Sequence, residues 1–142
     1  MKNPNCAYCM QGELVAAFGY PVCEMESGVL YLFREQSHPG RCILAHKKHV
    51  SELIDISGDE RDQFFADVAR ASRAIHQAFR PDKVNYGAYG DTGCHLHMHL
   101  VPKYKDGFEW GTTFEMNPAK QMLSDEACEE LAVKIRQELQ KI

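Results

Sequence analysis

Short apolar runs separated by turn residues fill the first half of the chain, and this pattern predicts β-strands. The runs 14–18 and 29–33 contain only aliphatic or aromatic residues. Turn-forming residues surround them at Gly19, Pro21, Ser27 and Gly28. A third strand is expected over 41–46, after a Ser-His-Pro-Gly turn at 37–40. We therefore expect three strands before the first long helix.

A long amphipathic helix is predicted next, from a start signal, a periodic face and a stop signal. Ser57 can cap its first turn, and Glu60 three residues later completes a capping box. Apolar residues then recur near helical spacing at Phe64, Phe65, Val68, Ala71, Ile75, Ala78 and Phe79. Pro81 ends this helix. A second helix is expected over about 124–141, with Asp125 and Glu126 at its positive end.

Two more strands are predicted between the helices, over 83–89 and 95–101, with a Gly-Asp-Thr-Gly turn at 90–93. The whole pattern predicts an α+β fold. It has an about five-stranded, mostly antiparallel sheet, one long central helix and a C-terminal helix. A length of 142 residues fits one domain, so we expect 1–142 to form a single domain.

Composition and charge narrow the function classes. A net charge of −4 argues against an extended nucleic-acid interface, which needs a basic face. No apolar run approaches the roughly 20 residues of a membrane-spanning helix. The polar N-terminus leads into no export signal, so we expect a cytoplasmic protein with no membrane partner. In that setting the six cysteines are better interpreted as thiols or metal ligands than as disulfides.

The most informative segment is 95–101, where His95, His97 and His99 alternate with apolar residues. Period two is typical of a strand, and it puts the three imidazoles on one face, about 6.6 Å apart. Imidazole serves as a nucleophile, an acid or base, a donor to phosphate or a metal ligand near neutral pH. Two alternatives remain open: a solvent-facing strand that carries histidine by chance, and a metal centre built from these histidines.

A second candidate site is the pair Cys6-x-x-Cys9, which has the spacing of two thiolate ligands of a tetrahedral zinc ion. Two further ligands must come from elsewhere in the chain. The alternatives are a redox pair and two unrelated thiols.

The alternation of histidine with apolar residues over 95–101 resembles the signature of the histidine triad (HIT) family of nucleotide hydrolases and transferases. The Lys-Lys-His-Val segment at 47–50, Asn85 and Pro102 also resemble family elements in order and spacing. The resemblance covers roughly residues 6–110. It implies a HIT-like fold and an enzyme of the phosphoramidase or dinucleoside polyphosphate hydrolase type, acting on a nucleotide-type small molecule.

The resemblance also implies catalytic roles. His97 would be the nucleophile that attacks an α-phosphorus and forms a covalent nucleotidyl-histidine. His99 would donate to a non-bridging oxygen, and Thr92 would donate to the phosphate or the leaving group. Gly90, Asp91 and Gly93 would complete the turn beside the phosphate, although 90–93 is equally consistent with an ordinary hairpin turn.

Substrate binding is less fully specified by the resemblance. Asn85 would hold a ribose or phosphate oxygen, and Trp110 would supply an aromatic ring. Family members commonly bind the ribose through an acidic residue, but ungapped counting back from His49 puts Phe33 at that position. Arg34 or Glu35 would then be the substitutes. For Asn85 and Trp110, an exposed polar residue and ordinary packing are open alternatives.

The resemblance further implies a structural Zn²⁺ held by Cys6, Cys9, His49 and His95, with His46 as an alternative to His49. Four protein ligands leave no open coordination position, so this metal would not be the catalyst. A two-fold homodimer is the expected assembly. Two other functions remain open: a nucleotide-binding or regulatory module with little turnover, and a metalloenzyme whose histidine row binds a catalytic metal.

Overall fold

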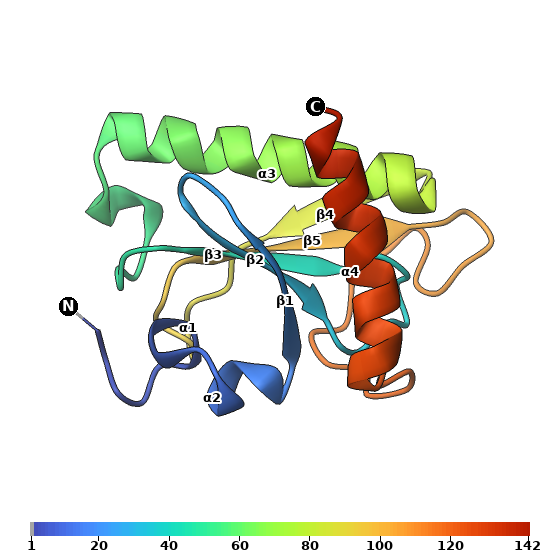
Figure 1. Ribbon diagram of the computed structural model, residues 1–142, viewed down its shortest axis with the longest axis horizontal. Coiled ribbons are helices and arrows are strands. Elements are labelled where there is room, and N and C mark those ends of the chain that lie inside the picture. The colour runs from blue at the N-terminus through green and yellow to red at the C-terminus, as the bar shows by residue number, and fades with distance from the viewer. Residues whose placement is uncertain (1) are drawn as a thin grey trace.

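The computed structural model describes residues 2–142, which form one five-stranded sheet covered by helices (Figure 1). Every neighbouring pair of strands is antiparallel, and the order across the sheet is β1-β2-β3-β5-β4. The strands are β1 (Gly19–Glu24), β2 (Gly28–Phe33), β3 (Cys42–His46), β4 (Lys83–Gly87) and β5 (His97–Lys103). The predicted α+β class and the predicted number of strands are therefore confirmed.

Both long helices lie where the sequence predicts them. The long helix α3 spans Gly58–Phe79, and the capping box is formed by Ser57 and Glu60, each side chain accepting from the other's backbone N–H. The C-terminal helix α4 spans Asp125–Gln140, capped by Ser124. Shorter helical turns are α1 (Ala7–Met10), α2 (Glu13–Ala16) and the 3₁₀ turn η1 (Leu53–Asp55). Local capping and helical periodicity were sufficient to find the two long helices.

The strand predicted over 14–18 is wrong. This run forms the helical turn α2, where Val15 is buried and Leu14 is half exposed. The first strand is β1, which contains Gly19 and Pro21, two residues interpreted as turn formers. Proline is tolerated there because β1 is an edge strand, and the pairing with β2 shifts register between Pro21 and Cys23.

The strands that surround the predicted turn at 90–93 are shorter there than expected. β4 ends at Gly87 and β5 begins at His97, so a loop over 88–96 replaces a tight hairpin turn. His95 consequently lies just before the strand and not within it, although its side chain is buried. The longer loop gives residues 90–93 room to border a pocket.

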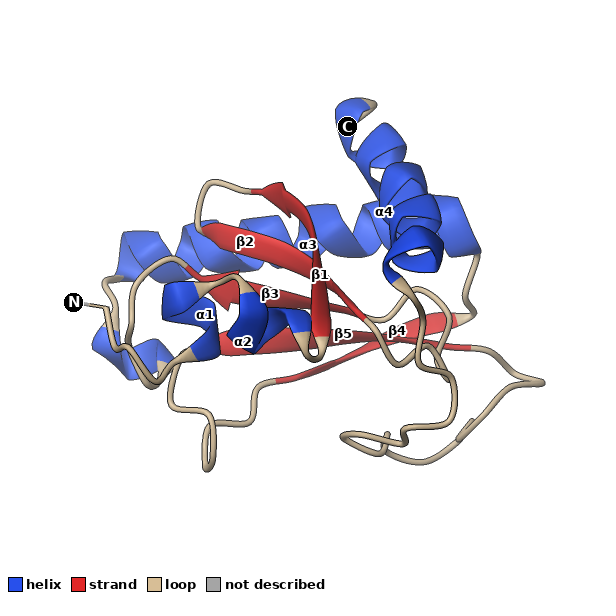
Figure 2. Ribbon diagram, turned by 60° about the horizontal axis from the view of Figure 1, so that its bottom comes forward, coloured by secondary structure: helices blue, strands red, loops and turns tan. Residues whose placement is uncertain are grey.

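The two faces of the sheet have different partners. Leu30, Leu32, Leu44, Met98 and Leu100 project into the main core beneath α3 and α4. Figure 1 shows α3 on one side of the sheet and α1 and α2 on the other, while Figure 2 shows long loops beside β4 and β5. Within residues 2–142, no helix combines the length and the hydropathy needed to cross a membrane.

Candidate active site and metal centre

The central strand β5 carries His97 and His99 on the face opposite the main core. Their cross-strand neighbours on β3 are Ala45 and Ile43, whereas Met98 lies opposite Leu44 in the core. The two imidazole centroids are 5.3 Å apart. The extended conformation predicted for this segment is therefore present, and it brings two rings side by side.

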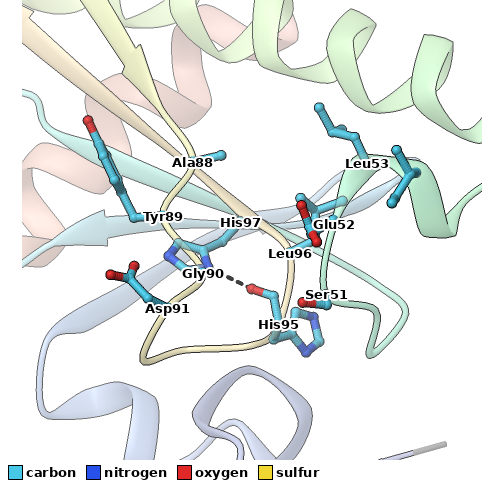
Figure 3. Close-up of a pocket in the computed structure, with 11 residues that line it drawn as sticks. Ser51, Glu52, Leu53, Ala88, Tyr89, Gly90, Asp91, His95, Leu96 and His97 are labelled. Atoms are coloured by element: carbon cyan, nitrogen blue, oxygen red, sulfur yellow. Dashed lines mark hydrogen bonds between the residues drawn. The ribbon is translucent and has the colours of Figure 1, made fainter.

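His97 is oriented by the backbone. Its Nδ1 lies 2.6 Å from the carbonyl oxygen of His95, drawn as the dashed line in Figure 3. A carbonyl only accepts, so Nδ1 carries the proton and the lone pair is on Nε2. Burial lowers the pKa of His97, although the bond to the His95 carbonyl partly opposes this effect. The neutral imidazole therefore presents an unprotonated Nε2, as a nucleophile requires.

Two pockets are lined in part by the loop that precedes β5. A pocket of 620 Å³, shown in Figure 3, includes Gly90, Asp91 and His97 in its wall. A larger pocket of 870 Å³ includes both His97 and His99. The larger pocket is also lined by Tyr8, Phe18, Phe33, Ile43, Asp91, Thr92 and Gly93. The structure thus brings the histidines and most of the predicted 90–93 segment together.

Gly93 approaches the nucleophile candidate closely. A Cβ added to Gly93 would lie 3.8 Å from Cε1 of His97. The segment 90–93 is solvent-exposed, so its backbone and the Thr92 hydroxyl are free to contact a ligand in the pocket. This position suits a loop that contacts a phosphate beside His97.

Arg41 is a site residue that the sequence interpretation missed. Its side chain is fully buried, and its Nη2 donates to Nδ1 of His99 at 3.2 Å. The guanidinium carbon lies 4.2 Å from the centroid of Phe33 and 5.0 Å from that of Phe114. Arg41 lies just before β3 and two residues before Ile43, which pairs with His99, so the two side chains share a face. This spacing of two is the only signal in the sequence that Arg41 faces the histidine row.

Four side chains from distant segments form a compact cluster. Nδ1 of His95 lies 3.4 Å from Sγ of Cys6, 3.5 Å from Sγ of Cys9 and 3.3 Å from Nδ1 of His49. All four candidate ligand atoms lie within 4.8 Å of one another. Tetrahedral zinc, with its usual bond lengths, separates sulfur and nitrogen ligands by roughly 3.5 Å and two nitrogens by roughly 3.3 Å. The cluster therefore fits a tetrahedral metal ion.

The surroundings of the cluster support metal binding. Nε2 of His95 faces the carbonyl oxygen of His46, so the proton is on Nε2 and the lone pair of Nδ1 points at the cluster. His46 itself lies elsewhere, since its ring packs against Phe64 and its Nδ1 accepts from the Lys48 N–H. The four side chains that cluster are thus the four named in the expected ligand set, and His46 is not among them.

Tyr8 is a second residue that the sequence interpretation missed. It lies between the two cysteines, and its ring centroid is 5.1 Å from that of His97 and 5.5 Å from that of His95. A metal ion that fixes Cys6 and Cys9 also fixes Tyr8 against His97. The spacing of the two cysteines could have indicated this, because residue 8 cannot lie far from a centre that binds residues 6 and 9.

Asn85 and Trp110 lie together, apart from the pocket that holds His97 and His99. Both line a smaller pocket of 320 Å³ with Lys83 and Lys103. Asn85 pairs with Val101 on β5, whereas Gly87, two residues later on β4, pairs with His99. In this chain taken alone, the two residues do not reach the larger pocket.

Arg34 and Glu35 are engaged in contacts that stabilise the fold. Arg34 donates to the carbonyl of Ala16 and pairs with Asp125 at 2.7 Å. Glu35 is buried and accepts from the backbone N–H groups of Ser37, Lys120 and Gln121. Burial raises the pKa of Glu35, but these bonds and the Ser37 hydroxyl lower it by more. Neither side chain lines the larger pocket, whereas Phe33 does.

Comparison with known proteins now identifies the family. The model of the HIT domain matches residues 22–106, more than half of the chain. The chain belongs to the HIT family. A Bacillus subtilis relative called Protein hit is 26% identical over 118 residues, covering 78% of this chain and 79% of that protein. An AP-4-A phosphorylase of Mycobacterium tuberculosis is 33% identical over 73 residues, 47% of this HIT protein and 37% of the phosphorylase.

Solved structures share the fold of this HIT protein. A histidine triad protein of Sinorhizobium meliloti superimposes with a TM-score of 0.81 at 16% identity, covering 89% of this chain and 94% of that chain. A zinc-bound histidine triad family protein of Mycobacterium smegmatis gives a TM-score of 0.67 at 20% identity and covers 94% of each chain. Both likenesses confirm the HIT-like α+β fold.

Proposed function

We propose that this HIT protein is a nucleotidyl hydrolase or transferase that works through a covalent intermediate on His97. The observation that carries the proposal is the orientation of His97. Its Nδ1–H donates to the His95 carbonyl, which leaves the nucleophilic lone pair on Nε2. The same ring lines a large pocket beside His99. The AP-4-A phosphorylase among its relatives supports a nucleotide conjugate as the substrate class.

The reaction proceeds by two displacements. Nε2 of His97 attacks the α-phosphorus, and the bond between that phosphorus and the leaving group breaks, so the leaving group departs with the bonding electron pair and takes up a proton from solvent water. Water or an acceptor such as a phosphate or sugar phosphate then attacks the phosphorus, and the P–N bond to His97 breaks with its electron pair returning to Nε2. When water is the acceptor, its proton is released to solvent. Two easier steps thereby replace one difficult displacement.

Neighbouring groups stabilise the charge that develops on the phosphoryl oxygens. His99 donates from the same pocket, because its ring lies beside His97. Thr92 and Gly93 line the same pocket and contact the phosphate or the leaving group. The apolar wall formed by Phe18, Phe33 and Ile43 accommodates the nucleobase or the sugar.

We also propose a structural zinc ion on Cys6, Cys9, His49 and His95. The distances of the cluster and the zinc-bound relative from Mycobacterium smegmatis support it. When bound, the ion crosslinks the N-terminal segment to the start of β5. His95 thereby becomes a fixed point for the carbonyl that orients His97 and for Tyr8, which packs on His97. The division of the row into one ligand and two pocket histidines argues against a catalytic metal on all three.

Intact-mass spectrometry tests the proposed function. The zinc-loaded protein is mixed with adenosine phosphoramidate or a dinucleoside polyphosphate and quenched at short times. We expect a transient mass increase of one nucleotidyl group, mapped to His97 by peptide sequencing. The absence of an adduct and of product with several nucleobases would favour a nucleotide-binding module with little turnover.

The edge strand β4 supports the proposal of a two-fold homodimer. Tyr86 on β4 and Phe65 on α3 are large aromatic residues that are about half exposed (50% and 46%). An unpaired edge beside exposed aromatic side chains is a typical protein interface.

A charge at this edge tests the dimer. We expect Tyr86→Asp to shift the protein from dimer to monomer in sedimentation velocity, because a buried unpaired carboxylate opposes association. Glu24→Lys on the opposite edge strand β1 is the control and should remain dimeric. A wild-type protein that sediments as a monomer at micromolar concentration contradicts the proposal.

A further inference from the structure

Among residues 2–142, Arg41 is a buried cation without a carboxylate partner. Its side chain is fully buried, its two terminal nitrogens donate to the carbonyls of Glu115 and Met116, and no ion pair involves it among residues 2–142. Its Nε is a buried donor without a partner in the same part of the chain. The aromatic rings of Phe33 and Phe114, whose centroids both lie within 5.0 Å of the guanidinium carbon, supply part of the missing stabilisation. A fold maintains such an arrangement at a cost, which calls for a function.

The contact with His99 determines where the imidazole carries its proton. Nη2 of Arg41 lies 3.2 Å from Nδ1 of His99. A guanidinium only donates, so Nδ1 must accept, and the neutral ring then carries its proton on Nε2. No hydrogen bond to Nε2 of His99 is formed within the described chain, 2–142. The Nε2–H group is therefore available to a ligand in the pocket that His99 lines.

We infer that Arg41 is a positioning residue that holds His99 in the Nε2–H form, so that a neutral imidazole donates to the phosphoryl oxygen during transfer. The catalytic part of this inference rests on the proposed function, whereas the part that concerns the protonation of His99 is independent of it. Arg41 does not line the pocket and acts through His99. The guanidinium also places a fixed positive charge next to the donating imidazole. This charge stabilises the negative charge that develops on the phosphoryl oxygens.

The ionisation of both groups agrees with this arrangement. Burial, the Arg41 charge and the neighbouring His97 lower the pKa of His99 to about 3. Burial lowers the pKa of Arg41 to about 10, so the guanidinium stays charged at neutral pH. The donor and acceptor assignment therefore holds over the range in which the protein would work.

The protonation of His99 is measured directly by nitrogen NMR. In uniformly ¹⁵N-labelled, zinc-loaded protein, long-range ¹H–¹⁵N correlations distinguish a protonated ring nitrogen from an unprotonated one, and His99→Gln assigns the signals. We expect Nδ1 of His99 to be unprotonated and Nε2 to be protonated in the wild-type protein. A His99 protonated on Nδ1 would overturn the inference, whatever the catalytic activity of the protein.

Two substitutions then connect this protonation to catalysis. Arg41→Met keeps most of the side-chain length but removes every donor, so we expect mixed protonation of His99 and a fall in kcat of about 100-fold with KM changed by less than about threefold. Arg41→Lys retains a donor, and we expect it to keep Nδ1 unprotonated and to recover at least about tenfold of the lost kcat. Unchanged NMR signals or unchanged kcat in Arg41→Met would overturn the inference.

A matched control separates the positioning of His99 from disorder of the loop 109–116, whose carbonyls at Glu115 and Met116 accept from Arg41. Glu109→Gln weakens the same loop, because Glu109 accepts from the Glu115 N–H, but it does not touch His99. We expect Glu109→Gln to lower thermal stability and leave the His99 signals unchanged. An equal fall in kcat for Glu109→Gln and Arg41→Met would assign the effect to the loop and overturn the inference. If the wild type forms no nucleotidyl adduct but shows the expected protonation, the proposed function fails and the role of Arg41 in orienting His99 stands.

Discussion

His97→Ala should lower kcat for nucleotidyl transfer by at least about 10⁴-fold, because removal of a covalent nucleophile abolishes both displacement steps together. Substrate binding should survive, since the walls of the pocket formed by Phe18, Phe33 and Ile43 are unchanged. Steady-state hydrolysis of adenosine phosphoramidate measures the first effect, and titration calorimetry with a non-hydrolysable nucleotide measures the second. No nucleotidyl adduct should form on the variant.

A buried histidine outside the pocket provides the control for His97→Ala. His38 is fully buried and pairs with Glu109 at 2.7 Å. His38→Gln should reduce the melting temperature, because it disrupts a partly buried hydrogen bond to Glu109, and leave kcat within about threefold of wild type. If His97→Ala retained more than a tenth of the wild-type kcat, or if the adduct formed on another residue, His97 would not be the nucleophile.

Local signals were enough to predict most of the fold. The capping box at Ser57 and Glu60 and the helical spacing that follows located α3 to within one residue at its start. The run 14–18 failed because five consecutive apolar residues carry no periodicity that separates a helical turn from a strand. Pro21 misled the interpretation for a related reason: whether a proline disrupts a strand depends on its place at the edge of the sheet, which neighbouring residues do not reveal.

The site divides along the same line. His97, His99 and the four clustered side chains could be named from the sequence because a period of two and a CxxC pair are local patterns, and the family resemblance connected them. Arg41 was missed because its contact with His99 depends on the pairing of β3 with β5. Counting along a strand also suggested Arg34 and Glu35 as substrate ligands, but those side chains bind the chain around residues 16 and 120. Such long-range packing leaves no mark on the neighbouring sequence.

Loss of the proposed zinc ion should have the second large effect, and it should act on stability. If free zinc exceeds the Kd of the site by 1,000-fold, binding stabilises the folded protein by about 4 kcal/mol. For a chain of this size that corresponds to a fall in melting temperature of roughly 8–16 °C when the ion is lost. Cys9→Ser removes a buried ligand, so we expect it to lower zinc content from about one ion per chain and to lower the melting temperature by this amount.

Cys94→Ser is the matched control for Cys9→Ser, because Cys94 is exposed, lies in the same region and is not part of the cluster. It should leave both zinc content and melting temperature unchanged. A chelator should lower the melting temperature of the wild type but hardly that of Cys9→Ser, because each change removes the same interaction. Chelated protein that remains folded should still form the adduct on His97, since the proposed ion is structural and takes no part in the displacement. Full zinc content in Cys9→Ser would show that the metal is held elsewhere, and loss of the adduct from folded, zinc-free protein would show that adduct formation depends on the ion beyond its effect on folding.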